Sequence, residues 1–261
     1  MDVFIRDHAW FLAFWGTIVL FGMMESLLPQ FPEQADRARR WPTNFGLGIL
    51  NGLIMSSVPI ASVGSAQWAA EYGVGLLNWL AAPWWLAVPC TLLIKSLGHY
   101  VFHFFCHKHP QLWRLHRVHH SDVHLDVSST LRSHPLEMIA NIAFTISIVV
   151  VFGLPPVVVL IYETFEVFAD MLAHMNMRIP GAAERCARAL FVTPGLHRLH
   201  HSTARADTDS NYGSVFSFWD RLFGTFHAEA TRTGLPFRFG LDDVSPERAG
   251  NFQSQLKLPW G

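Results

Sequence analysis

Charged side chains are scarce in this sequence of 261 residues. Asp, Glu, Lys and Arg together make up 15% of it, whereas they make up about a quarter of an average soluble domain. Apolar types make up 51%, including 21 Phe and 10 Trp, and the mean hydropathy is +0.24. So few charges cannot cover a soluble globule of this size, which argues against a freely soluble or disordered protein.

Net positive charge is also missing. The formal net charge is −1, and only three lysines accompany 16 arginines. No global field attracts polyanions, so we expect no nucleic-acid partner. Cys90, Cys106 and Cys186 are too few and too scattered for a disulfide framework or a zinc ribbon. They fit a membrane protein whose polar part faces a reducing compartment.

Several apolar runs approach the roughly 20 residues that a helix needs to cross a bilayer. They predict membrane segments at 9–28, 45–63, 83–105 and 138–173. Pro155 and Pro156 interrupt the last run, which predicts either a helical hairpin or two short spans. The expected fold class is all-α: an integral membrane helical bundle that forms one domain over residues 1–261. Residues 228–261, with Pro, Gly and mixed charge, are expected to be a surface tail.

The distribution of arginine orients these segments. The first loop is Arg-rich around residues 37–40, whereas residues 64–82 contain no Lys or Arg. The polar segments 105–137 and 174–227 are again rich in Arg. The positive-inside rule therefore predicts that the first loop and both polar segments are cytoplasmic and that the N-terminus lies outside.

Histidine is unusually abundant, with 15 residues, of which 13 lie between positions 99 and 201. One pair has the spacing H-x-x-x-H, and the pattern H-x-x-H-H occurs twice. Residues three and four apart share one face of a helix, so each pattern is expected to present its imidazoles to one point. One further histidine ends the last apolar run. The nine candidate ligands are His103, His107, His116, His119, His120, His174, His197, His200 and His201.

Nine imidazoles are too many for one ion, because zinc usually takes four ligands and an octahedral ion takes six. The sequence therefore predicts two metal ions at the cytoplasmic helix ends, each with room for a small exogenous ligand. Imidazole suits zinc, copper and iron alike, so the spacing leaves the metal open. Whether His99, His124 or His134 adds a further ligand also stays open.

Acidic residues accompany the histidines. Glu163, Glu166, Asp170 and His174 are spaced three, four and four apart, which places them on one face of an otherwise apolar helix. Charges at membrane depth usually face a cavity or a partner. We expect Asp170 and Glu166 to hydrogen-bond metal-bound imidazoles. The alternative is that this end of the helix lies at the membrane interface, where water solvates the carboxylates.

These motifs carry a resemblance to a known family. They are His103-Phe-Phe-Cys-His107, the stretch from Pro110 to Asp122, Thr193-Pro194-Gly-Leu-His197, and Trp219-Asp220-Arg221. Together they resemble the fatty acid hydroxylase / sterol desaturase superfamily of integral-membrane, histidine-box, non-haem diiron oxygenases. The resemblance covers roughly residues 41–226 and is closest to small bacterial members.

The resemblance implies an oxidoreductase that uses O₂ to hydroxylate an unactivated C–H bond of a membrane lipid, such as a fatty acyl chain or a sterol. It implies two iron ions, with zinc as a substitute metal, and assigns the nine histidines as metal ligands and catalytic residues. A bacterial inner-membrane location is expected, with the active site in the cytoplasm.

Electrons would come from a separate ferredoxin or cytochrome b5-like reductase, since no flavin, haem or iron–sulfur signature is present. A desaturase of the same superfamily is the main alternative. A zinc-dependent membrane hydrolase ranks lower, because no H-E-x-x-H general base accompanies the ligands. A metal carrier also ranks lower, because the histidines gather at expected helix ends and do not follow a continuous transmembrane path.

Overall fold

The computed structural model describes residues 2–31, 36–57, 62–230 and 237–261, with side chains from residue 12 onward. Parts of the predicted membrane segment 45–63 and of the predicted tail 228–261 therefore lie outside the described residues. Within the described ranges the regular elements are helices, and there are three isolated β-bridges in addition. This agrees with the all-helical fold class.

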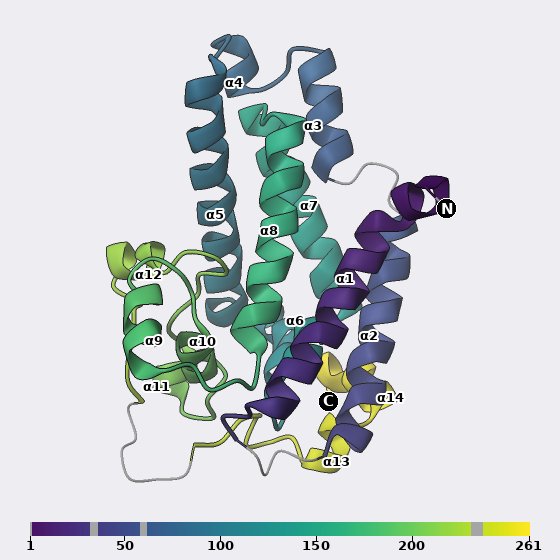
Figure 1. Cartoon of the computed structure of the whole chain (residues 1–261), viewed down its shortest axis with the longest axis vertical. Coiled ribbons are helices and arrows are strands. Elements are labelled where there is room, and N and C mark those ends of the chain that lie inside the picture. Colours follow the sequence, from purple (N-terminus) through teal and green to yellow (C-terminus); the bar gives the residue numbers. More distant parts are fainter. Residues whose placement is uncertain (1, 32–35, 58–61, 231–236) are drawn as a thin grey trace.

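The longer helices build the bundle, some of them at the upper end of Figure 1 and others along its right side into the lower part. They are α1 (Asp2–Leu27), α2 (Arg37–Ser57), α3 (Ser62–Glu71), α5 (Trp84–Lys108), α7 (Pro135–Phe152) and α8 (Pro156–His174). In the part of the chain that the structure describes, three stretches are long and apolar enough to cross a membrane, namely Arg37–Trp79, Trp84–Lys108 and Pro135–Phe152. Helix α8 is not among them, since it carries three carboxylates.

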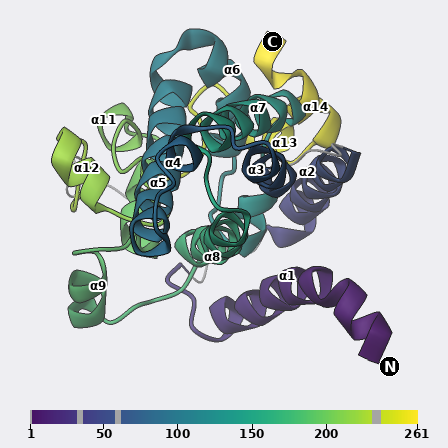
Figure 2. The ribbon, with the colours of Figure 1, turned by 90° about the horizontal axis from the view of Figure 1, so that it is seen from above.

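The bundle is built around α7 and α8, each of which packs against both α3 and α5 (Figure 1). Seen from above, α1 lies at the edge of the bundle, beyond α8 (Figure 2). Gly153 ends α7 in the left-handed conformation, at φ 62°, and Pro156 begins α8. A Cβ atom at Gly75 would lie 2.2 Å from the backbone nitrogen of Gly153. Glycine is therefore required at position 75, where the loop before Leu76 crosses the loop between α7 and α8.

Short helices gather at the opposite end. They are α6 (Pro110–His120), η1 (Val127–Leu131), α9 (Gly181–Ala187), α10 (Pro194–His200), α11 (Arg205–Thr208), α12 (Phe218–Phe223), α13 (Pro246–Ala249), α14 (Phe252–Lys257) and η2 (Leu258–Trp260), while α4 (Leu76–Trp79) lies at the far end. Proline occupies the first position of α6 and α10, where the missing N–H costs nothing. Thr193 caps α10 by accepting from the backbone N–H of Leu196 at 3.4 Å.

The C-terminal residues differ from the expected surface tail. Ala249 and Leu258 are buried and pack with Leu47 of α2 and Val118 of α6. The physical reason is that α14 packs against α2 and η2 packs against α6, which withdraws their apolar side chains from water. The described part of this segment therefore forms part of the hydrophobic core beside α6.

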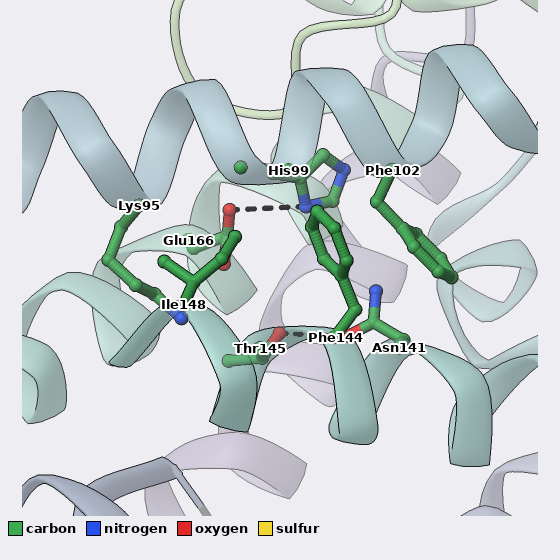
Figure 3. Close-up of a pocket in the computed structure, with 9 residues that line it drawn as sticks. Lys95, His99, Phe102, Asn141, Phe144, Thr145, Ile148 and Glu166 are labelled. Atoms are coloured by element: carbon green, nitrogen blue, oxygen red, sulfur yellow. Dashed lines mark hydrogen bonds and ion pairs between the residues drawn. The ribbon is translucent and has the colours of Figure 1, made fainter. Parts of the chain in front are cut away.

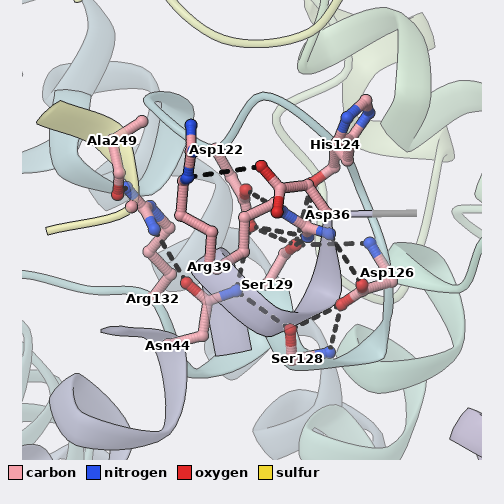
Figure 4. A network of polar contacts seen from close by, with 12 residues as sticks. Asp36, Arg39, Asn44, Asp122, His124, Asp126, Ser128, Ser129, Arg132 and Ala249 are labelled. Carbon is pink, nitrogen blue, oxygen red and sulfur yellow. Dashed lines mark hydrogen bonds and ion pairs between the residues drawn. The ribbon is translucent and has the colours of Figure 1, made fainter. Parts of the chain in front are cut away.

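A buried polar network joins α2 to η1 and to the loop after α6 (Figure 4). The Arg40 guanidinium donates from Nε to Asp122 Oδ1 at 2.5 Å and from Nη1 to Asp126 Oδ2 at 2.9 Å. Arg132 donates to Asn44 Oδ1 at 2.8 Å, and Asn44 donates to Asp122 Oδ2 at 3.0 Å. Burial would raise the pKa of Asp122, but the two guanidiniums outweigh it and lower that pKa below its usual range. The network holds η1 against α2.

Candidate metal centre

The nine candidate histidines lie together, in two adjoining clusters. Within each cluster one ring nitrogen of every histidine lies within 4.8 Å of the others, and every member is buried. The five-histidine cluster comprises His103, His107, His116, His120 and His200. The four-histidine cluster comprises His119, His174, His197 and His201. Each cluster has a donor set able to hold a metal ion.

The two H-x-x-H-H patterns do not each serve one point, which corrects the sequence-based expectation. In α6, His116 and His120 belong to the five-histidine cluster, whereas His119 belongs to the other. At α10 the split is reversed: His197 and His201 belong to the four-histidine cluster, whereas His200 belongs to the five-histidine cluster. Neighbouring residues on a helix point about 100° apart, since a turn takes about 3.6 residues. The two histidines of each H-H pair therefore face different clusters.

Four of the imidazoles are oriented by backbone carbonyls on their outer side. His103 Nδ1 lies 2.8 Å from the Tyr212 carbonyl and His119 Nδ1 lies 3.0 Å from that of Arg132. His174 and His200 make the equivalent contacts to Asp170 and Ser210, at 2.8 and 2.7 Å. A carbonyl only accepts, so each Nδ1 carries the proton and donates it outward. The inward Nε2 of each ring is left as a lone pair, the form in which imidazole binds a metal.

His116 is oriented differently, by a carboxylate. Its Nδ1 lies 2.6 Å from Glu137 Oε1, and both side chains are buried. Cys106 lies beside them and completes a third group of close ligand-type atoms. Glu137 lies in the first turn of α7, 21 residues from His116. No spacing in the sequence singles it out, because only the packing of α6 against α7 brings the two together.

The inward nitrogens face one another at distances that neutral rings cannot satisfy. His103 Nε2 lies 3.1 Å from His116 Nε2, and His119 Nε2 lies 3.3 Å from His174 Nε2. All four rings donate their proton outward, so none of these nitrogens has one left to donate. Both ring nitrogens of His107 and Nε2 of His200 are buried without a hydrogen-bond partner. Opposed lone pairs are costly unless a cation lies between them, so the donor set fits metal ions.

The electrostatics keep these rings in the ligand form. Burial, together with the neighbouring imidazoles, holds the pKa of His119, His120, His197 and His201 well below the usual range. Burial is also the main cause that lowers the pKa of His200 to about 3. Neutral imidazole at pH 7 is what metal binding requires.

The acidic face of α8 differs in part from its expected role. The Asp170 carboxylate lies 3.5 Å from His174 Nδ1, but the backbone oxygen of Asp170 is the closer acceptor. The expectation for Glu166 is wrong. Its carboxylate lies 3.2 Å from His99 and accepts from Ser214 at 2.8 Å, because the face turns toward α5 at that depth.

The three histidines left open by the sequence lie outside both clusters. His99 pairs with Glu166. His134 caps α7, accepting at Nδ1 from the N–H of Leu136 at 3.1 Å. The backbone oxygen of His124 accepts from Arg40 at 2.7 Å. Each has a structural partner of its own.

Comparison with known proteins agrees with this centre. Residues 88–225 match the family model described as fatty acid hydroxylase. An ornithine lipid hydroxylase of Rhizobium tropici is 31% identical over 84% of this chain and 67% of its own length. An alkylglycerol monooxygenase of Danio rerio is 31% identical over 62% of this chain, and human cholesterol 25-hydroxylase is 25% identical over 51%.

The chain spans 34% of that alkylglycerol monooxygenase and 48% of the cholesterol 25-hydroxylase. No solved structure matches the chain. The family match covers more than half of the sequence and includes all nine clustered histidines. The resemblance found in the sequence is therefore confirmed: the chain belongs to the fatty acid hydroxylase family, a family of oxidoreductases.

Proposed function

We propose that this protein is a membrane lipid hydroxylase that inserts one atom of O₂ into an unactivated C–H bond. The observation that carries the proposal is the pair of histidine clusters whose inward nitrogens are lone pairs. The relatives are named for ornithine lipid, alkylglycerol and cholesterol, which are all lipids. In the balanced reaction, the C–H bond, O₂, two electrons and two protons give the C–OH product and water.

We assign two iron ions to the centre, one held by the five-histidine cluster and one by the four-histidine cluster. Imidazole does not select iron over zinc. The proposed reaction needs a redox-active metal, however, and zinc has no redox chemistry. When bound, the two irons supply the electron transfer to O₂ that an unactivated C–H bond requires. The assignment makes all nine histidines metal ligands.

The chain itself contributes orientation and exclusion of water. The carbonyls of Tyr212, Arg132 and Ser210 fix the proton of their imidazoles on the outer nitrogen. The buried clusters keep bulk water away from the reacting atoms. Such outer contacts fix the orientation of the imidazole rings before the metal binds.

The whole chain would form one membrane-embedded domain in the bacterial inner membrane, with the N-terminus outside. The Arg-rich segments 105–137 and 174–227, which carry eight of the nine histidines with His103 just before them, would face the cytoplasm. A separate ferredoxin or cytochrome b5-like reductase would deliver the electrons there. O₂ and the lipid are the co-substrates.

The metal content of the purified, detergent-solubilised protein tests this function first. We expect about two irons per chain in a coupled site, seen by Mössbauer spectroscopy after growth on iron-57. Turnover under ¹⁸O₂ with a reductase system is then expected to add one heavy oxygen to a lipid. Zinc in place of iron, after growth with ample iron, would favour the hydrolase or carrier. A C=C product without heavy oxygen would favour the desaturase.

A further inference from the structure

An exposed apolar patch joins α12 to residues 188–191, the connection that follows α9. The large apolar side chains exposed within residues 174–227 are Leu222 at 67%, Phe223 at 53%, Leu190 at 47% and Phe191 at 39%. The two stretches lie together, because the N–H of Ser217 donates to the Leu190 carbonyl at 3.0 Å. Single apolar residues on a surface are ordinary, but a contiguous group marks an interaction surface. These four side chains are termed the α12 patch.

Helix α12 lies against the flank of α5, which is long and apolar enough to cross a membrane. Trp219 Nε1 donates to Ser96 Oγ at 3.0 Å. The Phe223 ring stacks on that of Tyr100, with centroids 5.2 Å apart. Figure 2 shows α12 at the edge of the molecule, beside α5. It therefore covers part of the α5 surface that faces away from the bundle.

The covered flank of α5 differs from the side that faces α7 and α8. On that inner side, His99 Nδ1 lies 3.2 Å from Glu166 Oε1 (Figure 3). On the flank that meets α12, Leu93 lies three residues before Ser96, so the two share one side of the helix. Leu93 is 48% exposed. The α12 patch thus continues an apolar surface of a membrane-crossing helix.

The depth of the contact follows from the length of α5. Its 25 residues extend over about 38 Å, and the hydrocarbon core of a bilayer is about 30 Å thick. If α5 crosses the core, at most about 8 Å of it can protrude on either side. Ser96 lies about 18 Å of helix from the end of α5 at Lys108. Helix α12 therefore meets α5 within the leaflet, in agreement with its place beside the lower half of α5 in Figure 1.

The border of the patch carries residue types that are typical of a membrane interface. Arg221 is exposed next to Leu222, and its guanidinium carbon lies 3.6 Å from the centre of the Phe226 ring. It also donates from Nη2 to the Arg188 carbonyl at 2.9 Å. Arginine can bury its stem in apolar surroundings while its head stays in water, and Trp is enriched at head-group level. The patch and its border therefore match acyl chains below a layer of head groups.

We propose that the α12 patch inserts into the lipid leaflet on the side of the histidine clusters, with Arg221 at the level of the head groups. The occupant of the patch is the acyl-chain region of the bilayer. This inference goes beyond the proposed lipid hydroxylase function and does not depend on it. It divides the segment 174–227, which the arginine pattern places wholly in the cytoplasm, into a part in the leaflet and a part outside it.

The insertion also bears on the metal centre. Asp220 of α12 accepts the backbone N–H groups of Tyr212 and Gly213, at 2.7 and 3.0 Å. The Tyr212 carbonyl in turn lies 2.8 Å from His103 Nδ1. A helix held in the leaflet thus supports the loop that orients one imidazole of the five-histidine cluster.

The test measures contact between the patch and lipid on the full-length protein, in nanodiscs that hold one chain each. Cys186 is replaced by serine, and a bimane fluorophore is attached to Leu222→Cys or Leu190→Cys. Glu247→Cys, an exposed position on α13 at the bottom of Figure 1, is the control. Phospholipids with a nitroxide on the acyl chain, just below the head group, quench bimane only on close approach. We expect both patch positions to lose most of their fluorescence and position 247 to keep it.

Quenching at positions 222 and 190 as weak as at 247 would overturn the proposal. A blue-shifted emission without quenching would also overturn it, because protein and not lipid would then cover the patch. Equal Tm values for the labelled variants and the unlabelled protein exclude unfolding as the cause of quenching. Turnover of a lipid under ¹⁸O₂ is a separate measurement, so the proposed function can fail while the α12 patch is confirmed, and the reverse.

Discussion

Glu137→Gln tests whether a carboxylate sets the metal affinity of one cluster. Glu137 Oε1 lies 2.6 Å from His116 Nδ1, and its other oxygen is buried without a partner. The four other outward contacts of the clustered imidazoles within 3.0 Å go to uncharged backbone carbonyls in the described structure. Glu137 therefore gives the five-histidine cluster a carboxylate in direct hydrogen-bond contact, whereas the Asp170 carboxylate beside the four-histidine cluster lies 3.5 Å from His174 Nδ1.

The size of the effect follows from this contact. A hydrogen bond to a charged group contributes about 1.5–3 kcal/mol, which corresponds to roughly 10–100-fold in an equilibrium constant. Loss of such an outer partner typically weakens metal binding by about the same factor. Glutamine keeps the shape and one acceptor oxygen, so we expect a loss of about tenfold, confined to the five-histidine cluster.

The assay is an anaerobic titration of metal-depleted protein with Co²⁺, whose visible absorption reports the ligand geometry. We expect two binding phases, of which only one weakens in Glu137→Gln. Glu247→Gln, an exposed carboxylate near the C-terminus, is the control and should leave both phases unchanged. Two unaltered phases in Glu137→Gln would refute the reasoning. Equal weakening of both, with a lower Tm, would show a merely structural role.

Three further predictions address the centre, the polar network and the topology. His119→Ala and His200→Ala remove one ligand from different clusters, so each should lower the iron content from about two to about one per chain and abolish turnover; full metal content in either variant would remove that histidine from the site. Arg40→Met leaves the buried Asp122 and Asp126 without their guanidinium, which is expected to cost about 3–5 kcal/mol and lower the Tm by roughly 10 °C; Arg39→Met, on the exposed side of α2, is the control. A cysteine at the exposed Tyr72, in a background with the exposed Cys186 replaced by serine, should react with a membrane-impermeant maleimide only from outside the cell; labelling only in inverted vesicles would reverse the orientation.

Much of the candidate centre could be predicted because its histidines come from short, regular patterns. Spacings of three and four residues mark one face of a helix, and the structure brings all nine patterned histidines together. Their division into five and four could not be predicted. It depends on which neighbouring helix faces each side of α6 and α10, and that is decided by tertiary packing.

Contacts between distant segments were equally hidden. Glu137 and His116 meet only because α6 packs on α7. Glu166 faces His99 and not the centre, because the direction of a carboxylate depends on the helix opposite. The C-terminal segment is polar in composition, so its few apolar side chains, such as Leu258, gave no sign that they complete a core.

The H-H pairs of α6 and α10 also link the two halves of the centre mechanically. His119 and His120 are joined by a single peptide bond yet belong to different clusters, and so do His200 and His201. An ion that immobilises one member of a pair also fixes the backbone from which the other projects. Loading of the first ion thus lowers the ordering entropy left for the second, so filling the tighter cluster should strengthen metal binding at the other.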